Sequence, residues 1–400
     1  MSLFSDVPMA PPDPILGITE QFRADTSPNK VNLGVGVYYD ADGRLPLLRS
    51  VEEAEKRLAA QARPKGYLPI DGLPAYIGHV QKLVFGAEAA VLDEDRVVTA
   101  QALGGTGALR VGADLLRQVS PEATVLISSP SWENHRALFT RAGFVVESYR
   151  YYAAGRTGVD IEGMIADLRG AVPGTIVVLH ACCHNPTGSD LSAAEWGRVI
   201  EVVKEQGLIA VLDMAYQGFS QGPEPDAAVV RRFAAEVPSF LVANSFSKNF
   251  SLYGERSGAL SLVCVDADEA ARVRSQMKIV IRTNYSNPTI HGASLVATVL
   301  GDEDLREQWL QELAEMRDRI KAMRSRLVRG LQDAGVTTDM SHLATQVGMF
   351  SFSGLSRDQM VRLRAEFGVY GTDSGRLNMA ALNEGNVDHV STAIAGVVGA

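Results

Sequence analysis

Residues 175–216, TIVVLHACCHNPTGSDLSAAEWGRVIEVVKEQGLIAVLDMAY, contain the pattern that decides the fold. The stretch begins and ends with short, almost continuously apolar runs, which are typical of strands covered on both faces. Between these runs, Ser192 and Glu195 have the spacing of a helix capping box, and the helical pattern after them stops at Gly207. A strand, a helix and a second strand in this order predict two parallel strands joined by a crossover helix.

The same alternation of strands and helices extends along the chain on both sides of this unit. Five more apolar runs have the length of a strand, and they are RVVTAQAL, ATVLISS, GFVVESYRY, SFLVANSFS and GALSLVCV, between residues 96 and 265. Together with the two runs described above, they predict an α/β protein with a mostly parallel sheet of seven strands flanked by helices.

The pattern changes beyond about residue 303. Apolar residues recur every three or four positions from Leu305 to Leu331, which predicts one long amphipathic helix ending near Gly335. The run GMFSFSG that follows alternates with a period of two, and the stretch SRDQMVRLRAEFG after it is amphipathic. We therefore predict a smaller α+β unit at the C-terminus.

The composition narrows the class of protein. The net charge of −9 and the absence of a basic, aromatic-rich patch argue against nucleic acid or an anionic membrane as the main partner. The first residues lack the charged and apolar regions of a secretory signal, and no apolar run approaches the ~20 residues that span a bilayer. The three cysteines are too few for a disulfide framework. We expect a soluble, cytoplasmic protein.

Cys182 and Cys183 are adjacent and end an apolar run. Side chains of neighbouring residues in a strand point to opposite faces of a sheet, so the two thiols are not expected to share a metal ion. The chain also lacks a second cysteine or histidine pair with the spacing of a metal site. We therefore predict no metal site.

In an open α/β sheet, ligands bind beyond the carboxyl ends of the strands, so the residues that follow each apolar run are candidates for the site. Gly104, Gly105, Thr106 and Gly107 stand where the first such run turns into a helix. Backbone N–H groups and the positive end of a helix favour a phosphate there, although a tight turn alone also accounts for the glycines. Arg110 occupies the place of the third glycine of a dinucleotide-binding motif, and the Gly-Lys of a P-loop is missing.

A lysine, Lys248, directly follows the run SFLVANSFS. Lysine is almost never buried without a partner, and desolvation lowers the pKa of its amine, which makes it a usable nucleophile toward a carbonyl. Ser245, Ser247 and Arg256 lie near it in the sequence and offer hydroxyl groups and a planar guanidinium suited to a phosphate. This stretch predicts Schiff-base chemistry next to a phosphate site.

Further strand ends carry polar or aromatic side chains. Asp213 follows one run with Tyr216 three residues later, Asn185 follows another, and Trp132 and His135 follow a third. Taken singly, they fit a helix cap or salt bridge, a turn, a core tryptophan and a loop histidine. Taken with the lysine and the phosphate ligands, they match a planar, phosphorylated aldehyde with a ring nitrogen, and pyridoxal phosphate has these features.

The chain resembles the class I pyridoxal-phosphate-dependent aminotransferases, in the aspartate and aromatic branch, and within it the bacterial aromatic and tyrosine aminotransferases. The matching stretches run in the same order from about residue 13 to residue 380, and they are DPILG, VNLGVGVYYD, YLPIDG, GGTGALR, PSWENH, HACCHNPTG, LDMAYQGF, SFSKNFSLYGERSGAL, IRTNYSNP, GMFSFSGL and SGRLNMA. The resemblance implies fold type I, with an N-terminal arm over residues 1–14, a large cofactor-binding domain over 46–319 and a small domain over 15–45 and 320–400. It also implies a homodimer with shared active sites.

The resemblance also implies a role for each matching residue. Lys248 would bind pyridoxal phosphate covalently and then carry a proton between substrate and cofactor, with Asp213 and Tyr216 as the other catalytic residues. Asp213 would keep the ring nitrogen protonated, and His135 would support Asp213 from behind. Tyr216 and Asn185 would contact the phenolic oxygen of the cofactor, and Trp132 would contact the ring face and the substrate. The implied phosphate contacts are Gly105, Thr106, Ser245, Ser247, Arg256 and the partner's Tyr67. The implied substrate contacts are Gly36, Asn185, Arg376 and the partner's Arg282.

Substrate choice depends on a few positions. Tyr39 and Leu45 stand where strict aspartate enzymes of the family tend to carry polar or charged residues, whereas Arg282 retains a cation for a side-chain carboxylate. We expect transfer of the amino group of tyrosine, phenylalanine or aspartate to 2-oxoglutarate by a ping-pong mechanism. Gly104 replaces a serine of many relatives and removes one phosphate hydroxyl.

Three other functions are alternatives. A strict aspartate aminotransferase is the first, and another pyridoxal-phosphate reaction on the same fold is the second. The third is a regulator that uses an aminotransferase-like domain beside a DNA-binding module, which is disfavoured because the matching motifs begin near residue 13.

Overall fold

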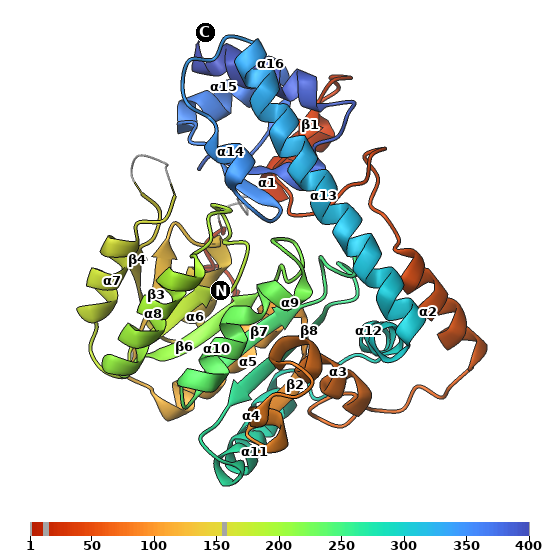
Figure 1. The fold of residues 1–400 in the computed structure, drawn as a ribbon, viewed down its shortest axis with the longest axis vertical. Coiled ribbons are helices and arrows are strands. Elements are labelled where there is room, and N and C mark those ends of the chain that lie inside the picture. The colour runs from red at the N-terminus through yellow and green to blue at the C-terminus, as the bar shows by residue number, and fades with distance from the viewer. Residues whose placement is uncertain (1, 11–15, 154–157, 400) are drawn as a thin grey trace.

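The computed structural model describes residues 2–10, 16–153 and 158–399. A seven-stranded sheet lies between two layers of helices (Figure 1). In sheet order its strands are β2 (Val97–Leu103), β8 (Ser257–Val263), β7 (Phe240–Ser245), β6 (Ile209–Met214), β5 (Ile176–His180), β3 (Thr124–Ser129) and β4 (Val145–Arg150). β8 is antiparallel to both of its neighbours, and every other pair is parallel. The predicted α/β fold with a mostly parallel seven-stranded sheet is confirmed.

Burial follows the position of each strand in the sheet. Every residue of β5, β7 and β8 is buried, as expected for strands covered on both faces. β4 lies at the edge, and Tyr149 is its one buried residue. β5 and β6 are paired so that His180 lies opposite Asp213 at their carboxyl ends. The register of the central strands therefore brings their last residues to one level.

Helices cover both faces of the sheet and contribute to two separate clusters of buried side chains. One face is covered by α5 (Gly104–Val119), α6 (Glu133–Arg141) and α11 (Ala267–Asn284). The other is covered by α3 (Pro74–Phe85), α7 (Ile161–Arg169), α8 (Ala193–Glu205) and α10 (Ala228–Glu236). The remaining helices of this part are α2 (Arg49–Ala60), α4 (Ala90–Asp93), α9 (Pro223–Asp226) and α12 (His291–Gly301).

The predicted capping box begins α8. The Ser192 hydroxyl accepts a hydrogen bond from the Glu195 N–H, and the Glu195 carboxylate accepts one from the Ser192 N–H. Two N–H groups that have no partner within the helix are thereby satisfied, which fixes the point at which the crossover helix starts.

α13 (Glu303–Asp333) is one helix of 31 residues, about 46 Å long. The whole predicted stripe from Leu305 to Leu331 is buried, so the predicted long amphipathic helix is confirmed. One half of α13 packs against α2 and α12, and the other half packs against α16 (Val387–Val398) (Figure 1). The helix therefore connects the layer next to the sheet with the C-terminal elements.

The C-terminal elements form a smaller unit together with a segment from the start of the chain (Figure 1). β1 (Val31–Asn32) pairs in parallel with β10 (Val369–Tyr370), and β9 (Phe350–Phe352) pairs with β11 (Arg376–Asn378) in antiparallel fashion. Its helices are α1 (Leu16–Ala24), α14 (His342–Thr345), α15 (Arg357–Phe367) and α16. These pairings support our proposal of a small domain over residues 15–45 and 320–400 and a large domain over residues 46–319.

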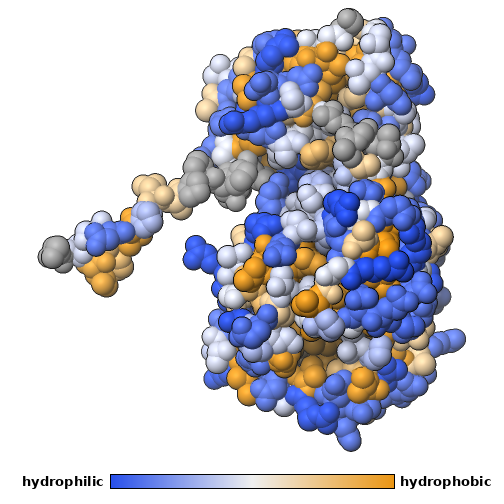
Figure 2. All heavy atoms as spheres, turned by 90° about the vertical axis from the view of Figure 1, so that its left-hand side faces the viewer, coloured by the Kyte–Doolittle hydropathy of each residue, from blue (hydrophilic) through white to orange (hydrophobic). Residues whose placement is uncertain are grey.

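Residues 2–10 project away from the body of the molecule (Figure 2). Leu3, Phe4, Val7 and Met9 are highly exposed there. Residues 11–14 of the predicted arm and residue 15 at the expected start of the small domain lie outside the described residues. Within the described residues, no helix is both long and apolar enough to cross a membrane.

Candidate active site

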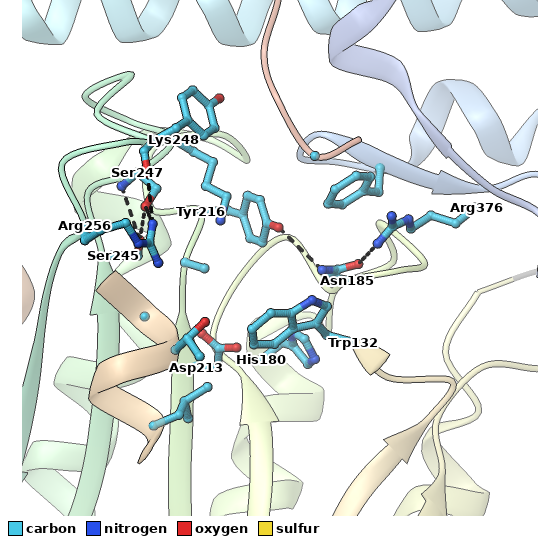
Figure 3. Close-up of a pocket in the computed structure, with 17 residues that line it drawn as sticks. Trp132, His180, Asn185, Asp213, Tyr216, Ser245, Ser247, Lys248, Arg256 and Arg376 are labelled. Atoms are coloured by element: carbon cyan, nitrogen blue, oxygen red, sulfur yellow. Dashed lines mark hydrogen bonds between the residues drawn. The ribbon is translucent and has the colours of Figure 1, made fainter. Parts of the chain in front are cut away.

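The carboxyl ends of β5, β6 and β7 and the N-terminus of α5 surround a cavity of about 200 Å³ (Figure 3). The small unit and the segment before α2 close its other side. The cavity is lined by Gly36, Gly105, Thr106, Leu109, Trp132, His180, Asn185, Asp213, Ala215, Tyr216, Ser245, Ser247, Lys248, Tyr253, Arg256, Phe350 and Arg376. Most of the predicted site residues therefore meet in one place, although they are far apart in the sequence.

Lys248 follows β7 and directs its amine into the cavity, next to the ring of Tyr216 (Figure 3). The Nζ atom lies 5.1 Å from the centroid of that ring. Burial lowers the pKa of Lys248 to about 8, although the negative charge of Asp213 opposes the shift, and Arg256 adds to it. At neutral pH a larger fraction of this amine is therefore unprotonated than in an ordinary lysine, which is what a nucleophile requires.

Asp213 is the last residue but one of β6 and is 5% exposed. Its Oδ2 lies 2.9 Å from Nε2 of His135, whose Nδ1 lies 2.9 Å from the Ser131 hydroxyl. Burial alone raises the pKa of Asp213, but the hydrogen bond to His135 and the nearby charges of His135, His180 and Lys248 outweigh it and lower the pKa below the ordinary value. The site therefore holds a carboxylate that stays ionised inside the protein.

A hydroxyl-rich corner lies where β7 approaches the N-terminus of α5 (Figure 3). The Ser245 hydroxyl donates to Ser247 Oγ over 3.1 Å and accepts from the Ser247 N–H over 3.2 Å. Arg256 Nη1 lies 3.4 Å from Ser247 Oγ. The first N–H groups of α5, at Gly105 and Thr106, lie at the same corner. Positive charge, hydroxyl groups and a helix N-terminus together suit a phosphate.

Gly104 shows why a serine is absent from this turn. Its φ angle is +68°, a backbone conformation that favours glycine. A Cβ atom at this position would lie 2.6 Å from Nη2 of Arg256. The guanidinium of Arg256 thus lies where a side chain of residue 104 would begin. A serine at this position would displace the guanidinium, so the chain has the cation here instead of the serine hydroxyl.

The opposite end of the cavity contains a buried guanidinium. Arg376 is 1% exposed, donates to the Gly34 carbonyl over 2.8 Å, and has Nη1 3.5 Å from Asn185 Oδ1 (Figure 3). Asn185 in turn donates to the Tyr216 hydroxyl over 3.4 Å. Burial lowers the pKa of Arg376, and the nearby Glu133 carboxylate, 3.8 Å from Nη1, partly opposes this shift. Arg376 therefore stays cationic at neutral pH, facing a cavity that can admit a carboxylate.

Five lining residues were not predicted from the sequence, and three of them, His180, Tyr253 and Phe350, contribute rings to the cavity. His180 ends β5 next to Asp213, so the rule of inspecting strand ends could have identified it. Tyr253 accepts a hydrogen bond from the Tyr38 N–H and thereby ties the lysine loop to the segment that carries Gly36. Phe350 comes from β9, and no local pattern in the sequence indicates that its ring reaches the cavity.

Three predicted site residues lie outside the cavity of the single chain. His135 stands behind Asp213, as expected from its implied role. Tyr67 is 95% exposed and lies in a loop between α2 and α3, and Arg282 is exposed near the end of α11, where it contacts Ser286. Both were expected to act on the partner's site, so their distance from this cavity agrees with that expectation without testing it.

Two residues that were expected to favour aromatic substrates do not line the cavity. Leu45 is 50% exposed, and Tyr39 packs at the border of the core. The aromatic lining comes instead from Trp132, Tyr253 and Phe350.

The expected orientation of the two adjacent cysteines is wrong. β5 ends at His180, so Cys182 and Cys183 lie in the turn beyond the strand rather than within it. Their sulfur atoms and a carboxylate oxygen of Asp226 lie within 4.8 Å of one another. The alternation of side chains in a strand does not apply to this turn.

The residues around the cavity fit pyridoxal phosphate. A nucleophilic amine, an ionised buried carboxylate and a phosphate corner lie on three sides, matching an aldehyde, a ring nitrogen and a phosphate. Nε2 of His180 and Nε of Arg376 are buried and have no hydrogen-bond partner among the described residues, which suits a site that binds polar groups. The fold and this arrangement define an enzyme of fold type I that uses pyridoxal phosphate.

Comparison with known proteins identifies the family. Residues 28–394 match the model of the family Aminotransferase class I and II. The chain is 57% identical over 398 residues to an aspartate aminotransferase of Pseudomonas aeruginosa, with all of both chains covered. It is 59% identical to the aromatic-amino-acid aminotransferase from Burkholderia pseudomallei, whose crystal structure, covalently bound to pyridoxal phosphate, matches with a TM-score of 0.98 over all of both chains.

A third relative is named for aromatic amino acids and was crystallised with aspartic acid. The aromatic amino acid aminotransferase of Psychrobacter sp. B6, cocrystallised with aspartic acid, is 42% identical, with a TM-score of 0.96 and 99% of each chain covered. The chain belongs to the class I and II aminotransferase family. It is a pyridoxal-phosphate-dependent aminotransferase of the aspartate and aromatic branch, and its substrates are amino acids and 2-oxo acids, as the sequence predicted.

Proposed function

We propose that this aminotransferase has dual specificity. It transfers the amino group of tyrosine, phenylalanine or aspartate to 2-oxoglutarate in a ping-pong reaction. The observation that carries this proposal is a buried carboxylate clamp next to aromatic walls: Arg376 is 1% exposed and its guanidinium lies 4.5 Å from the ring of Phe350. Relatives of nearly equal identity named for aspartate and for aromatic amino acids support both kinds of donor.

We assign the chemical steps to two buried side chains. Bound pyridoxal phosphate supplies an electron sink for the negative charge that develops on the α-carbon of the substrate. The Lys248 amine would remove the proton from that carbon and deliver it to the cofactor carbon that carried the aldehyde, and its pKa of about 8 is suited to both directions of transfer at neutral pH. Asp213 stays ionised and holds a proton on the ring nitrogen, which keeps the sink effective.

We assign the polar side chains of the cavity to three recognition tasks. Tyr216 and Asn185, which are linked by a hydrogen bond, orient the phenolic oxygen of the cofactor. Trp132 lines the cavity (Figure 3), where it would lie against the ring face and the substrate. The phosphate is held by Gly105, Thr106, Ser245, Ser247 and Arg256. These contacts come from fixed strand ends, so the cofactor is held in one orientation relative to Lys248.

We assign the substrate carboxylates to two arginines. Arg376, with the Gly36 backbone beside it, binds the α-carboxylate common to every substrate, because a guanidinium can form two parallel hydrogen bonds with a carboxylate. The partner's Arg282 binds the second carboxylate of aspartate and 2-oxoglutarate. Trp132 and Phe350 offer aromatic surface to tyrosine and phenylalanine. The partner's Arg282 would therefore serve the dicarboxylic substrates, and the aromatic walls would serve tyrosine and phenylalanine.

We propose that the active unit is a homodimer in the cytoplasm. Tyr67 and Arg282 are exposed on one chain, and we assign them to the site of the partner subunit. The arm of residues 2–10 exposes four large apolar side chains, which a partner surface would cover. The three cysteines are free and buried, which agrees with a reducing compartment.

Steady-state kinetics test the dual specificity. We expect kcat/KM values for tyrosine, phenylalanine and aspartate within about two orders of magnitude of one another, because the second arginine would serve aspartate and the aromatic walls would serve tyrosine and phenylalanine. Negligible turnover of tyrosine beside aspartate would leave the strict aspartate aminotransferase as the function. The first half reaction separates amino transfer from other reactions on this fold, because it must leave the amino group on the enzyme and release a 2-oxo acid in equal amounts.

A further inference from the structure

Two thiols and a carboxylate lie close together near the start of the loop that carries Asn185. Cys182 and Cys183 come from the turn after β5, and Asp226 comes from the end of α9. One ligand atom from each of the three lies within 4.8 Å of the other two, and all three residues are buried. No step of the proposed amino transfer uses this cluster.

The turn itself brings the two adjacent thiols to the same side. Cys183 has a φ angle of +52°, which is uncommon for a residue other than glycine. Asp190 holds the turn in this shape, because its carboxylate accepts the N–H groups of Cys183 over 2.7 Å and His184 over 2.8 Å. A strained backbone that is held in place by a neighbouring side chain often marks a functional position.

Backbone N–H groups hold the Asp226 carboxylate in a fixed orientation. Asp226 Oδ2 accepts the N–H groups of Gly218 and Ser220 over 2.8 Å and 3.0 Å, and Oδ1 accepts that of Gln221 over 2.9 Å. The Gly222 N–H is a further backbone donor to this carboxylate. These four bonds fix the carboxylate plane, and a carboxylate that accepts such bonds can still ligate a metal ion.

A cavity of about 320 Å³ gives access to the cluster, with Cys182, Asp190 and Asp226 in its lining. Arg232 also lines this cavity, but its Nε is paired with Glu236 and its Nη1 donates to a backbone carbonyl. The cavity therefore offers room for a water molecule as a further ligand next to two acidic groups.

We propose that Cys182, Cys183 and Asp226 bind one soft divalent cation of the zinc or cadmium type. Two thiolates and one carboxylate are ligands that such ions prefer, and a water molecule from the cavity completes four-fold coordination. Sulfur atoms about 2.3 Å from a tetrahedral ion lie about 3.7 Å apart, so small shifts of side chains from the observed separation suffice. The site is independent of the amino transfer and does not rest on the proposed substrates.

Binding must release two protons. A hydrogen bond between the thiols lowers the pKa of Cys182, but burial and nearby carboxylates outweigh it and raise the pKa to about 11, while burial raises the pKa of Cys183 well above its usual value. Both thiols are therefore protonated at neutral pH before the ion binds. Because the ion binds thiolates rather than thiols, its apparent affinity should rise with pH.

Titration of the holoenzyme with Cd²⁺ tests the site. The thiolate-to-metal charge-transfer band in the ultraviolet reports binding, and the cofactor absorbs at longer wavelength. We expect one ion per chain in the wild type and in C264S, and at least about 100-fold weaker binding in C182S and in C183S. Cys264 is a matched control, since it is also buried but belongs to the cluster of side chains on the other face of the sheet.

Two measurements on the wild type do not depend on the folding of any variant. X-ray absorption of the Cd²⁺ complex should show two sulfur neighbours, and titration at several pH values should show release of two protons per ion. No binding at micromolar Cd²⁺ overturns the proposal, as does a complex with fewer than two sulfur neighbours. Unchanged binding in both C182S and C183S, or its loss in C264S, also overturns it.

Discussion

The two ends of the active-site cavity are built differently. At the cofactor end, Lys248, Asp213, Ser245 and Ser247 come from neighbouring strand ends of one sheet, and the two serines already bond to each other. At the substrate end, Arg376 and Phe350 come from the small unit, and the implied second clamp, Arg282, lies outside this cavity. Most of the implied cofactor contacts thus come from one folded chain, with the partner's Tyr67 as the exception, whereas substrate choice depends on how larger parts come together.

The difference has a physical cause. Hydrogen bonds along β5, β6 and β7 fix the positions of their last residues, so the cofactor groups need little rearrangement. Arg376 has a buried Nε without a hydrogen-bond partner among the described residues, and its Nη1 bonds only loosely to Asn185 over 3.5 Å. Its strongest interaction is therefore expected with a substrate carboxylate.

The largest expected effect tests the cofactor end. We expect K248A to lower kcat by roughly 10⁴-fold with every donor, because it removes the group that moves the proton. Reduction with borohydride followed by mass spectrometry should find no cofactor attached to the variant. K204A, at an exposed position of α8, serves as the control and should keep wild-type activity. Activity within tenfold of wild type in K248A would contradict the assignment.

Variants of the two arginines test the substrate end. We expect R376A to lower kcat/KM about 10²- to 10³-fold for tyrosine and aspartate alike, because both carry the α-carboxylate. R282A should cause a similar loss for aspartate and a change of only a few-fold for tyrosine. Equal losses for both donors in R282A would show that Arg282 does not recognise the side-chain carboxylate.

Mixing two inactive variants tests whether the clamp comes from the partner. In a dimer of one K248A chain and one R282A chain, one site contains both substitutions and the other site contains neither. Random exchange of equal amounts should therefore restore about a quarter of the wild-type activity with aspartate. Failure to restore activity, with dimers present by native mass spectrometry, would place Arg282 outside the partner's site.

The pH dependence of cofactor capture tests the environment of Lys248. The neutral amine is the nucleophile, so the rate at which apoenzyme binds pyridoxal phosphate covalently should rise about tenfold per pH unit and level off above the pKa of about 8. D213N should move this midpoint to lower pH, because Asp213 raises the pKa of the lysine. Stopped-flow absorbance measures the rate, and a midpoint near the ordinary lysine value of 10.5 would contradict the prediction.

A smaller effect tests the turn at the phosphate corner. We expect G104S to lower the free energy of unfolding by about 1–3 kcal/mol and to weaken retention of the cofactor, because residue 104 has a positive φ angle and faces Arg256. G254S is the matched control, since a Cβ at Gly254 meets no atom within 4 Å. Thermal unfolding of both variants measures the difference, and equal melting temperatures would remove the steric explanation for Gly104.

The sequence predicted the cofactor end better than the substrate end. Apolar runs, the capping box at Ser192 and polar residues after each strand are local signals, and they led to Lys248 and Asp213 because parallel strands end at one edge. Phe350 reaches the cavity through packing of the small unit, and nothing in its local sequence indicates this. The turn at Cys183 depends on a positive φ angle that is stabilised from outside by Asp190. Such long-range effects leave no periodic pattern.

The length of α13 sets the spacing between the two ends of the site. Near its start, the Trp309 indole donates to the carbonyl of Asn249, next to Lys248 in the chain. Fifteen positions later, Arg324 donates to the carbonyls of Gly348 and Phe350 over 2.8 Å and 2.7 Å. One residue inserted between these arginine and tryptophan positions would turn one anchor by about 100° relative to the other and lengthen the spacing by about 1.5 Å. Homologues should therefore tolerate insertions in the surrounding loops but keep this interval at constant length.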